Sequence, residues 1–196
     1  MKNLQYCSFG FCFLAILIII PSLLFAQDST DFNWKRYENS KFRFSIDIPD
    51  STKFEGVDSN YLVLIIPLRQ SNALLEKHEL EINIFKSDSC CINPKSAFGK
   101  ILQYFENDVK VVNYNNRDFY LEQDTDHAMG GAACIERYYS TCRKSDNTCL
   151  IFYFQLFYHN KYDEATEGFT EPDFNFEVEL ETAYRILSSL DFPDMR

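Results

Sequence analysis

Basic residues are scarce in this sequence: 19 lysines and arginines stand against 29 aspartates and glutamates among 196 residues, which gives a formal net charge of −10. A surface of this charge repels phosphate groups, so nucleic acid and anionic membranes are excluded as favoured partners. A basic protein, a cation or a neutral ligand remains compatible with it. The sequence also lacks internal repeats and any linker rich in proline, glycine or serine, which predicts a single domain.

The N-terminus has the pattern of a secretory signal peptide. Lys2 precedes an almost wholly apolar run over residues 9–25, and the small residue Ala26 stands at the expected cleavage site. We expect residues 1–26 to be removed and residues 27–196 to form one exported domain with a formal charge of −11. A retained anchor is the alternative, because the run approaches the roughly 20 residues that span a bilayer. The ending FAQ resembles export signals of Bacteroides-like bacteria, which indicates a Gram-negative periplasm or secretion.

The cysteines beyond the cleavage site are expected to form disulfides, as is usual in an oxidising compartment. In the segment CRKSDNTC, a polar turn lies between two aromatic and β-branched runs, which predicts a hairpin with Cys142 opposite Cys149. No histidine or further cysteine lies nearby at the spacing of a zinc site, and the spacing of the two cysteines is not that of a redox motif. Five cysteines follow the cleavage site, an odd number, so one thiol is left over or pairs between molecules. Cys90 and Cys91 are adjacent, so one of them could pair with Cys134 and leave the other free.

The predicted hairpin register gives one largely apolar face. It pairs Thr141 with Leu150, Tyr139 with Phe152, Arg137 with Phe154 and Ile135 with Leu156.

Hydrophobic periodicity predicts an α+β fold. Strands are expected at residues 41–49, 60–68 and 79–87, and a helix is expected at residues 93–108 behind the start signal Asn93-Pro94. Three or four further strands and a helix over residues 173–189 follow. The expected architecture is therefore a single domain, with a mainly antiparallel sheet of about six to seven strands and two main helices packed on it, in the order βββ-α-βββ(β)-α.

The best catalytic candidate is the segment EQDTDHAMGGAAC. A thiol nucleophile needs a base and an orienting acid, and Cys134, His127 and Asp126 are of the right types. Their spacing matches no known motif, so a loop between two strands is the competing interpretation. Asp124, Asp126 and His127 lack the ligand spacing of a calcium loop. We therefore expect no metal site and no cofactor.

Two surfaces are candidates for binding a protein. Eight acidic residues and no basic one occur over residues 163–181, which suits either a solvated helix face or a docking surface for a basic protein. The candidates in this segment are Glu171, Asp173, Glu177, Glu179 and Glu181. On the other face of the hairpin, an exposed apolar patch would result if no helix covered Tyr138, Ile151, Tyr153 and Phe157.

Two terminal motifs, YENSKFRFSIDIPD and AYRILSSLDF, resemble those of the PsbP-like group of small exported α+β proteins. The resemblance implies a non-enzymatic role in binding or assembling other proteins, and it carries over no catalytic residue. Our leading hypothesis is an exported, monomeric, non-catalytic domain that binds an unknown protein, for example an acidic periplasmic inhibitor or immunity protein against a basic toxin. The alternatives are a small hydrolase that uses Cys134 or His127, and a metal-binding or small-ligand-binding protein.

Overall fold

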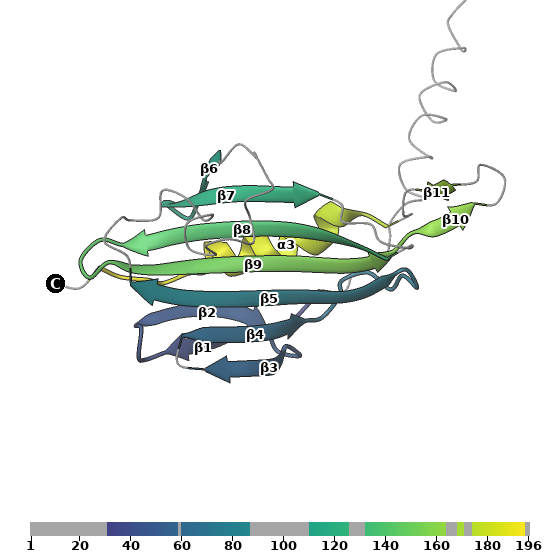
Figure 1. Ribbon diagram of the computed structural model, residues 1–196. Coiled ribbons are helices and arrows are strands. Elements are labelled where there is room, and N and C mark those ends of the chain that lie inside the picture. The colour runs from purple at the N-terminus through teal and green to yellow at the C-terminus, as the bar shows by residue number, and fades with distance from the viewer. Residues whose placement is uncertain are drawn as a thin grey trace, which may run out of the picture.

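The computed structural model describes residues 31–58, 60–86, 110–125, 132–163, 168–170 and 174–194. In this part of the chain, a large antiparallel sheet has the helix α3 (Phe176–Ser188) packed on one face, behind the sheet in Figure 1. The hairpin β1–β2 lies behind the same sheet, and the opposite face is turned toward the viewer.

The main sheet has seven strands in the order β3-β4-β5-β9-β8-β7-β6, and every neighbouring pair is antiparallel. Two smaller sheets are formed by β1 with β2 and by β10 with β11. The strands are β1 (Trp34–Asn39), β2 (Phe44–Pro49), β3 (Lys53–Asp58), β4 (Tyr61–Ile66), β5 (Leu75–Lys86), β6 (Lys110–Tyr114), β7 (Arg117–Thr125), β8 (Ala132–Arg143), β9 (Thr148–His159), β10 (Lys161–Asp163) and β11 (Gly168–Thr170).

The long hairpin β8–β9 is the centre of the sheet, and its predicted register is confirmed. Ile135 lies opposite Leu156, and the same ladder continues to Cys142 opposite Cys149. A disulfide joins these two cysteines at the end of the hairpin. Asn147 completes the turn with a φ of 56°, a left-handed conformation that asparagine tolerates well. The segment CRKSDNTC is therefore the closed end of a hairpin.

Removal of this disulfide is expected to cost about 2 kcal/mol in the free energy of unfolding, because the bond closes a short loop and so restricts the unfolded chain modestly. The double variant C142S/C149S tests this by urea denaturation at pH 7. An unchanged denaturation midpoint would contradict the prediction. A peptide map of the unreduced wild type should first show residues 142 and 149 in one linked pair.

The hydrophobic core lies between the sheet and α3. Phe152 and Phe154 of β9 and Ile46 of β2 are fully or almost fully buried there. On α3, buried residues recur every three or four positions, as expected for an amphipathic helix, and these are Leu180, Ala183, Ile186 and Leu187. Each large apolar side chain buried in this way contributes about 1.5 to 3 kcal/mol.

The predicted fold class is wrong in its balance of elements. Instead of two helices on six to seven strands, the described residues hold one helix and nine strands in the main sheet and the β1–β2 sheet, with the short β10–β11 pair in addition. The sequence prediction missed β1 and β3. Their sequences WKRYEN and KFEGVD are charged and largely exposed, so they lack the apolar alternation by which strands were assigned. The helix expected at residues 93–108 lies outside the described residues.

No helix in the described part of the chain is long and apolar enough to cross a membrane. The predicted signal peptide, residues 1–26, lies outside this part and stays a prediction.

Candidate functional site

Cys134 does not have the environment of a catalytic thiol. It lies on β8 with only 8% of its surface exposed. Burial, together with the nearby carboxylates of Glu136 and Glu79, raises the pKa of the thiol to about 12, so the thiol is protonated at neutral pH. Asp126 and His127, its expected partners in catalysis, lie outside the described residues.

Cys134 is also a free cysteine, which corrects the expectation that it pairs with Cys90 or Cys91. Those two residues lie outside the described part of the chain. Within that part, no group of three or more histidine, cysteine, aspartate or glutamate side chains is placed to hold a metal ion.

The acidic segment at the start of α3 is only partly a surface. Glu179 is fully buried, and its carboxylate accepts hydrogen bonds from the backbone N–H groups of Arg69 (2.9 Å) and Gln70 (2.8 Å). The side-chain amide of Gln70 donates a third bond at 3.1 Å. Glu179 thus ties the helix to the connection between β4 and β5, and its predicted role in docking is wrong.

The other acidic candidates divide into two groups. Glu177 and Glu181 are exposed on α3, and Glu181 forms an ion pair of 3.0 Å with Arg69. Glu171 and Asp173 lie outside the described residues.

The face of the sheet opposite α3 carries no exposed apolar patch at its centre, the outcome considered for a face that no helix covers. Ile151 and Tyr138 are buried, with 1% and 5% of their surfaces exposed, while Tyr153 and Phe157 are half-buried. Tyr138 and Tyr153 lie opposite each other on β8 and β9, and their rings stack with centroids 4.2 Å apart. The two tyrosines are therefore brought together as one unit.

Glu136 is the common hydrogen-bond acceptor beside this tyrosine pair. Its carboxylate accepts hydrogen bonds from the hydroxyls of Tyr153 and Tyr138 and from the side-chain amide of Gln155 (3.3 Å). Burial and the hydrogen bond to Glu136 raise the pKa of Tyr153 well above its ordinary value. The hydroxyl of Tyr153 is therefore a protonated donor at neutral pH.

The same face continues onto β5, β4 and β3 with more carboxylates. In the register, Glu81 lies opposite Tyr153 and Glu79 lies opposite Gln155. The hydroxyl of Tyr61 donates to Glu81 at 2.7 Å, and this bond is the largest cause that raises the pKa of Tyr61 to about 12.

Lys77 offsets part of this charge. Its ammonium lies 2.5 Å from a carboxylate oxygen of Glu79 and 3.4 Å from one of Glu55.

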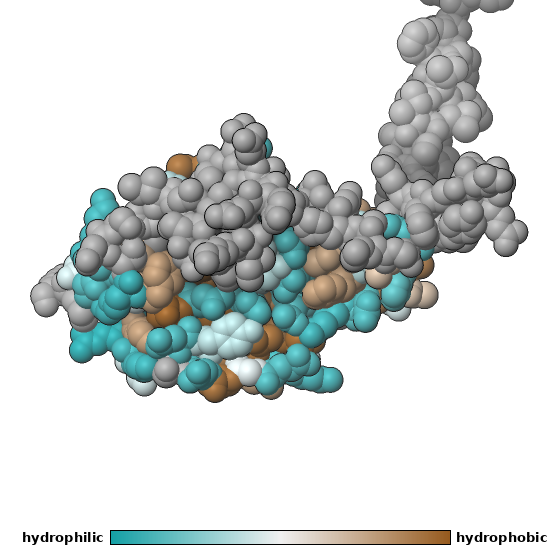
Figure 2. All heavy atoms as spheres, in the orientation of Figure 1, coloured by the Kyte–Doolittle hydropathy of each residue, from teal (hydrophilic) through white to brown (hydrophobic). Residues whose placement is uncertain are grey.

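We call this surface the acidic tyrosine face, and it consists of Tyr61, Glu79, Glu81, Glu136 and Tyr153. Tyr138 is buried and supports it by stacking on Tyr153. The face lies on four consecutive strands, β4-β5-β9-β8. Figure 2 views the molecule from the side of the sheet opposite α3, and hydrophilic and hydrophobic residues are mixed over the coloured part of the surface. The arrangement holds several carboxylates in fixed positions on a rigid sheet.

Sequence reasoning missed the glutamates of β5, although a signal for them was present. The alternation that buries Leu80, Ile82 and Ile84 requires Glu79 and Glu81 to share the opposite face. Glu136 could not have been added in the same way, because β8 is separated from β5 by β9 and its place on the same face depends on the strand order.

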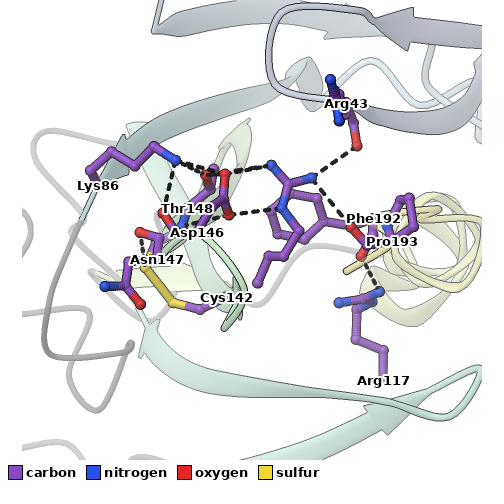
Figure 3. Close-up of polar contacts among 11 residues, drawn as sticks. Arg43, Lys86, Arg117, Cys142, Asp146, Asn147, Thr148, Phe192 and Pro193 are labelled. Carbon is purple, nitrogen blue, oxygen red and sulfur yellow. Dashed lines mark hydrogen bonds and ion pairs between the residues drawn. A yellow bond between two sulfur atoms is a disulfide. The ribbon is translucent and has the colours of Figure 1, made fainter. Parts of the chain in front are cut away.

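A second polar cluster, shown in Figure 3, closes the end of the β8–β9 hairpin. The guanidinium of Arg143 donates through Nε and Nη2 to the two carboxylate oxygens of Asp146, at 2.8 and 2.9 Å. Lys86 Nζ (2.7 Å) and Thr148 Oγ1 (2.6 Å) also donate to Asp146. These bonds, the one from Arg143 above all, lower the pKa of Asp146 below its ordinary value.

This cluster has a structural role. Arg143 Nη1 donates to the backbone carbonyls of Arg43 (3.3 Å) and Pro193 (3.4 Å), and the guanidinium lies over the ring of Phe192 at 4.5 Å. Arg143 therefore connects the hairpin to the turn before β2 and to the segment around Phe192 and Pro193.

A cavity of about 380 Å³ lies beside the disulfide. Its lining includes two basic residues, Arg117 and Lys144, and two acidic ones, Asp118 and Asp194. Charges of both signs meet there, so the cavity does not select a ligand by its charge.

No protein-family model and no curated protein matches the sequence. The fold is similar to that of a protein from Bacteroides thetaiotaomicron VPI-5482, with a TM-score of 0.52 and 10% sequence identity over 82% of this chain and 48% of that one. This chain thus spans about half the length of that protein. The fold is also similar to that of the Saccharomyces cerevisiae Ran-binding protein Mog1p, with a TM-score of 0.51 and 9% identity over 84% of this chain and 97% of that one.

These likenesses show the fold alone. They confirm the coarse expectation of a small α+β domain dominated by its sheet. Membership of the PsbP-like group stays a prediction.

Proposed function

We propose that the protein is an exported, non-catalytic domain whose acidic tyrosine face docks a basic segment of another protein. The observation that carries this proposal is the gathering of Glu79, Glu81 and Glu136 on one sheet face. Carboxylates held in fixed positions attract lysine and arginine side chains, speed encounter with a basic partner and disfavour acidic ones.

Four further observations support the proposal. The formal net charge of −10 attracts a basic partner toward the protein before contact is made. A structure with a similar fold, Mog1p, is named as Ran-binding, which indicates that this fold can serve protein recognition. The protonated, buried thiol of Cys134 offers no nucleophile. The apolar segment over residues 9–25 supports export, so an acidic periplasmic inhibitor or immunity-type protein is one concrete form of the proposal.

The test neutralises the acidic tyrosine face and compares it with an equal change elsewhere. The protein is immobilised, exposed to a periplasmic extract, and each captured protein is identified and then titrated in purified form. The variant E79Q/E81Q is expected to weaken binding of a basic partner by about tenfold or more, because it removes two charges that face the partner. The wild-type affinity should also fall as salt is added.

The matched control is E177Q/E181Q, which removes the same charge from the exposed side of α3. It should leave binding within about twofold of the wild type. If E177Q/E181Q abolishes binding and E79Q/E81Q does not, the docking surface is on α3 and the proposed face is wrong. A captured partner that is itself acidic would also contradict the proposal.

A further inference from the structure

The edge strand β3 is an exposed surface that the proposed function does not use. It has β4 on one side and no strand on the other in the described part of the chain, and it forms the lower edge of the sheet in Figure 1. Phe54 and Val57 on this strand are 44% and 71% exposed. The unpaired backbone N–H and C=O groups of an edge strand are a template for pairing with another strand, and exposed apolar side chains favour such pairing.

A β-bulge gives this edge an unusual symmetry. The register shifts between Phe54 and Gly56, so that Lys53 and Asp58 are opposite Ile65 and Tyr61, which lie on the side of β4 away from α3. Phe54 and Val57 are opposite residues of the core side. Without the bulge, five positions of strict alternation would place Lys53 and Asp58 on opposite faces.

We infer that two copies of this chain associate by antiparallel pairing of β3 with β3. The strand sequence KFEGVD is complementary to itself in this arrangement. Lys53 of one copy faces Asp58 of the other, and Phe54 faces Val57, and each pair occurs twice because of the two-fold axis. Directly opposed residues must share a face of the sheet, and the bulge satisfies this condition for both pairs.

Glu55 lies near the two-fold axis, where its counterpart carries the same charge. Its carboxylate lies 3.4 Å from the ammonium of Lys77 in its own chain. This ion pair offsets the charge of Glu55, so the repulsion across the axis is reduced.

The pairing has a consequence for the proposed function, although it does not depend on it. A two-fold axis perpendicular to the sheet places the faces opposite α3 of both copies on the same side, so two acidic tyrosine faces lie on one extended surface. A partner with two basic segments would then bind bivalently. The interface is short and falls in the weak class that buries less than about 1,200 Å². The association therefore replaces the expected monomer only at high protein concentration.

The test is sedimentation velocity over a concentration series at fixed ionic strength, with the protein purified after export. A non-reducing gel verifies that no disulfide links the copies. The wild type should shift from monomer toward dimer as concentration rises. The single variants K53D and D58K should each weaken the dimer by about tenfold or more, because each change turns two attractive pairs into repulsive ones.

Two rescues separate this register from a general surface effect. An equimolar mixture of K53D and D58K should associate again, since one chain presents two acids and the other two bases. The double variant K53D/D58K should also dimerise by itself. A wild type that stays monomeric throughout, a dimer indifferent to K53D, or a mixture that fails to associate would each overturn the inference. Circular dichroism verifies that the variants are folded.

Discussion

Replacement of Asp146 by asparagine is expected to lower the free energy of unfolding by about 3 to 5 kcal/mol, the range found when one partner of a buried ion pair is removed. The side chains of Arg143 and Asp146 are only 2% and 12% exposed. Asparagine keeps the shape of the side chain but not its charge, so the guanidinium of Arg143 is left buried without a neutralising group. Urea denaturation at pH 7 measures the change.

The control is D47N, which removes a carboxylate from an exposed ion pair. Asp47 lies 2.9 Å from Arg36, but both side chains are more than a third exposed, at 39% and 38%. Pairs of this kind contribute about 0 to 1 kcal/mol. If D146N costs no more than D47N, burial does not set the strength of the Arg143–Asp146 pair and the structural role of the cluster is wrong.

The pH dependence of this pair has a definite sign. The pKa of Asp146 is lowered in the folded chain, so its contribution is complete above the unfolded pKa of about 3.9 and is lost as the pH falls below that value. Between pH 7 and pH 5 the pair adds no slope to the stability of the protein.

Local signals in the sequence were sufficient for the hairpin of β8 and β9. The polar turn between Cys142 and Cys149 and the alternation on both sides lie within one continuous segment, so turn and pattern together fix the register. Strand β3 gave no such signal. Its two apolar side chains, Phe54 and Val57, are exposed, and the strand has no buried residue. An edge strand contacts little of the core, so it has no apolar alternation to detect.

The candidate site was harder to predict because its residues meet only through the strand order. Glu81 and Glu136 belong to segments far apart in the sequence, and β9 brings them to one face by pairing with both β5 and β8. The acidic segment near α3 was a stronger local signal, yet Glu179 within it is buried. A charged residue in a helix can serve an internal hydrogen-bonding role that composition alone does not distinguish from a surface role.

Between pH 6.5 and pH 4, His78 is expected to remove roughly 3 kcal/mol from the free energy of unfolding. The ring of His78 lies on β5 beside Phe154 with 1% of its surface exposed, and neither ring nitrogen has a hydrogen-bond partner among the described residues. Burial lowers the pKa of His78 to about 4. The unfolded chain, with a pKa near 6.5, binds a proton that the folded chain does not, so stability falls with pH across this window by roughly 1.4 kcal/mol per pH unit.

The variant H78L isolates this effect, since leucine fills much of the same space without a titratable group. Denaturation curves at pH 7, 6, 5 and 4 should show a steep loss of stability in the wild type and a flatter profile in H78L. The comparison is the difference between the two profiles, because carboxylates that titrate near pH 4 contribute to both. The control H159Q changes an exposed histidine, whose side chain is 55% accessible, and should follow the wild type. Parallel profiles for H78L and the wild type would contradict the prediction, because they would show that His78 binds a proton equally in the folded and the unfolded chain.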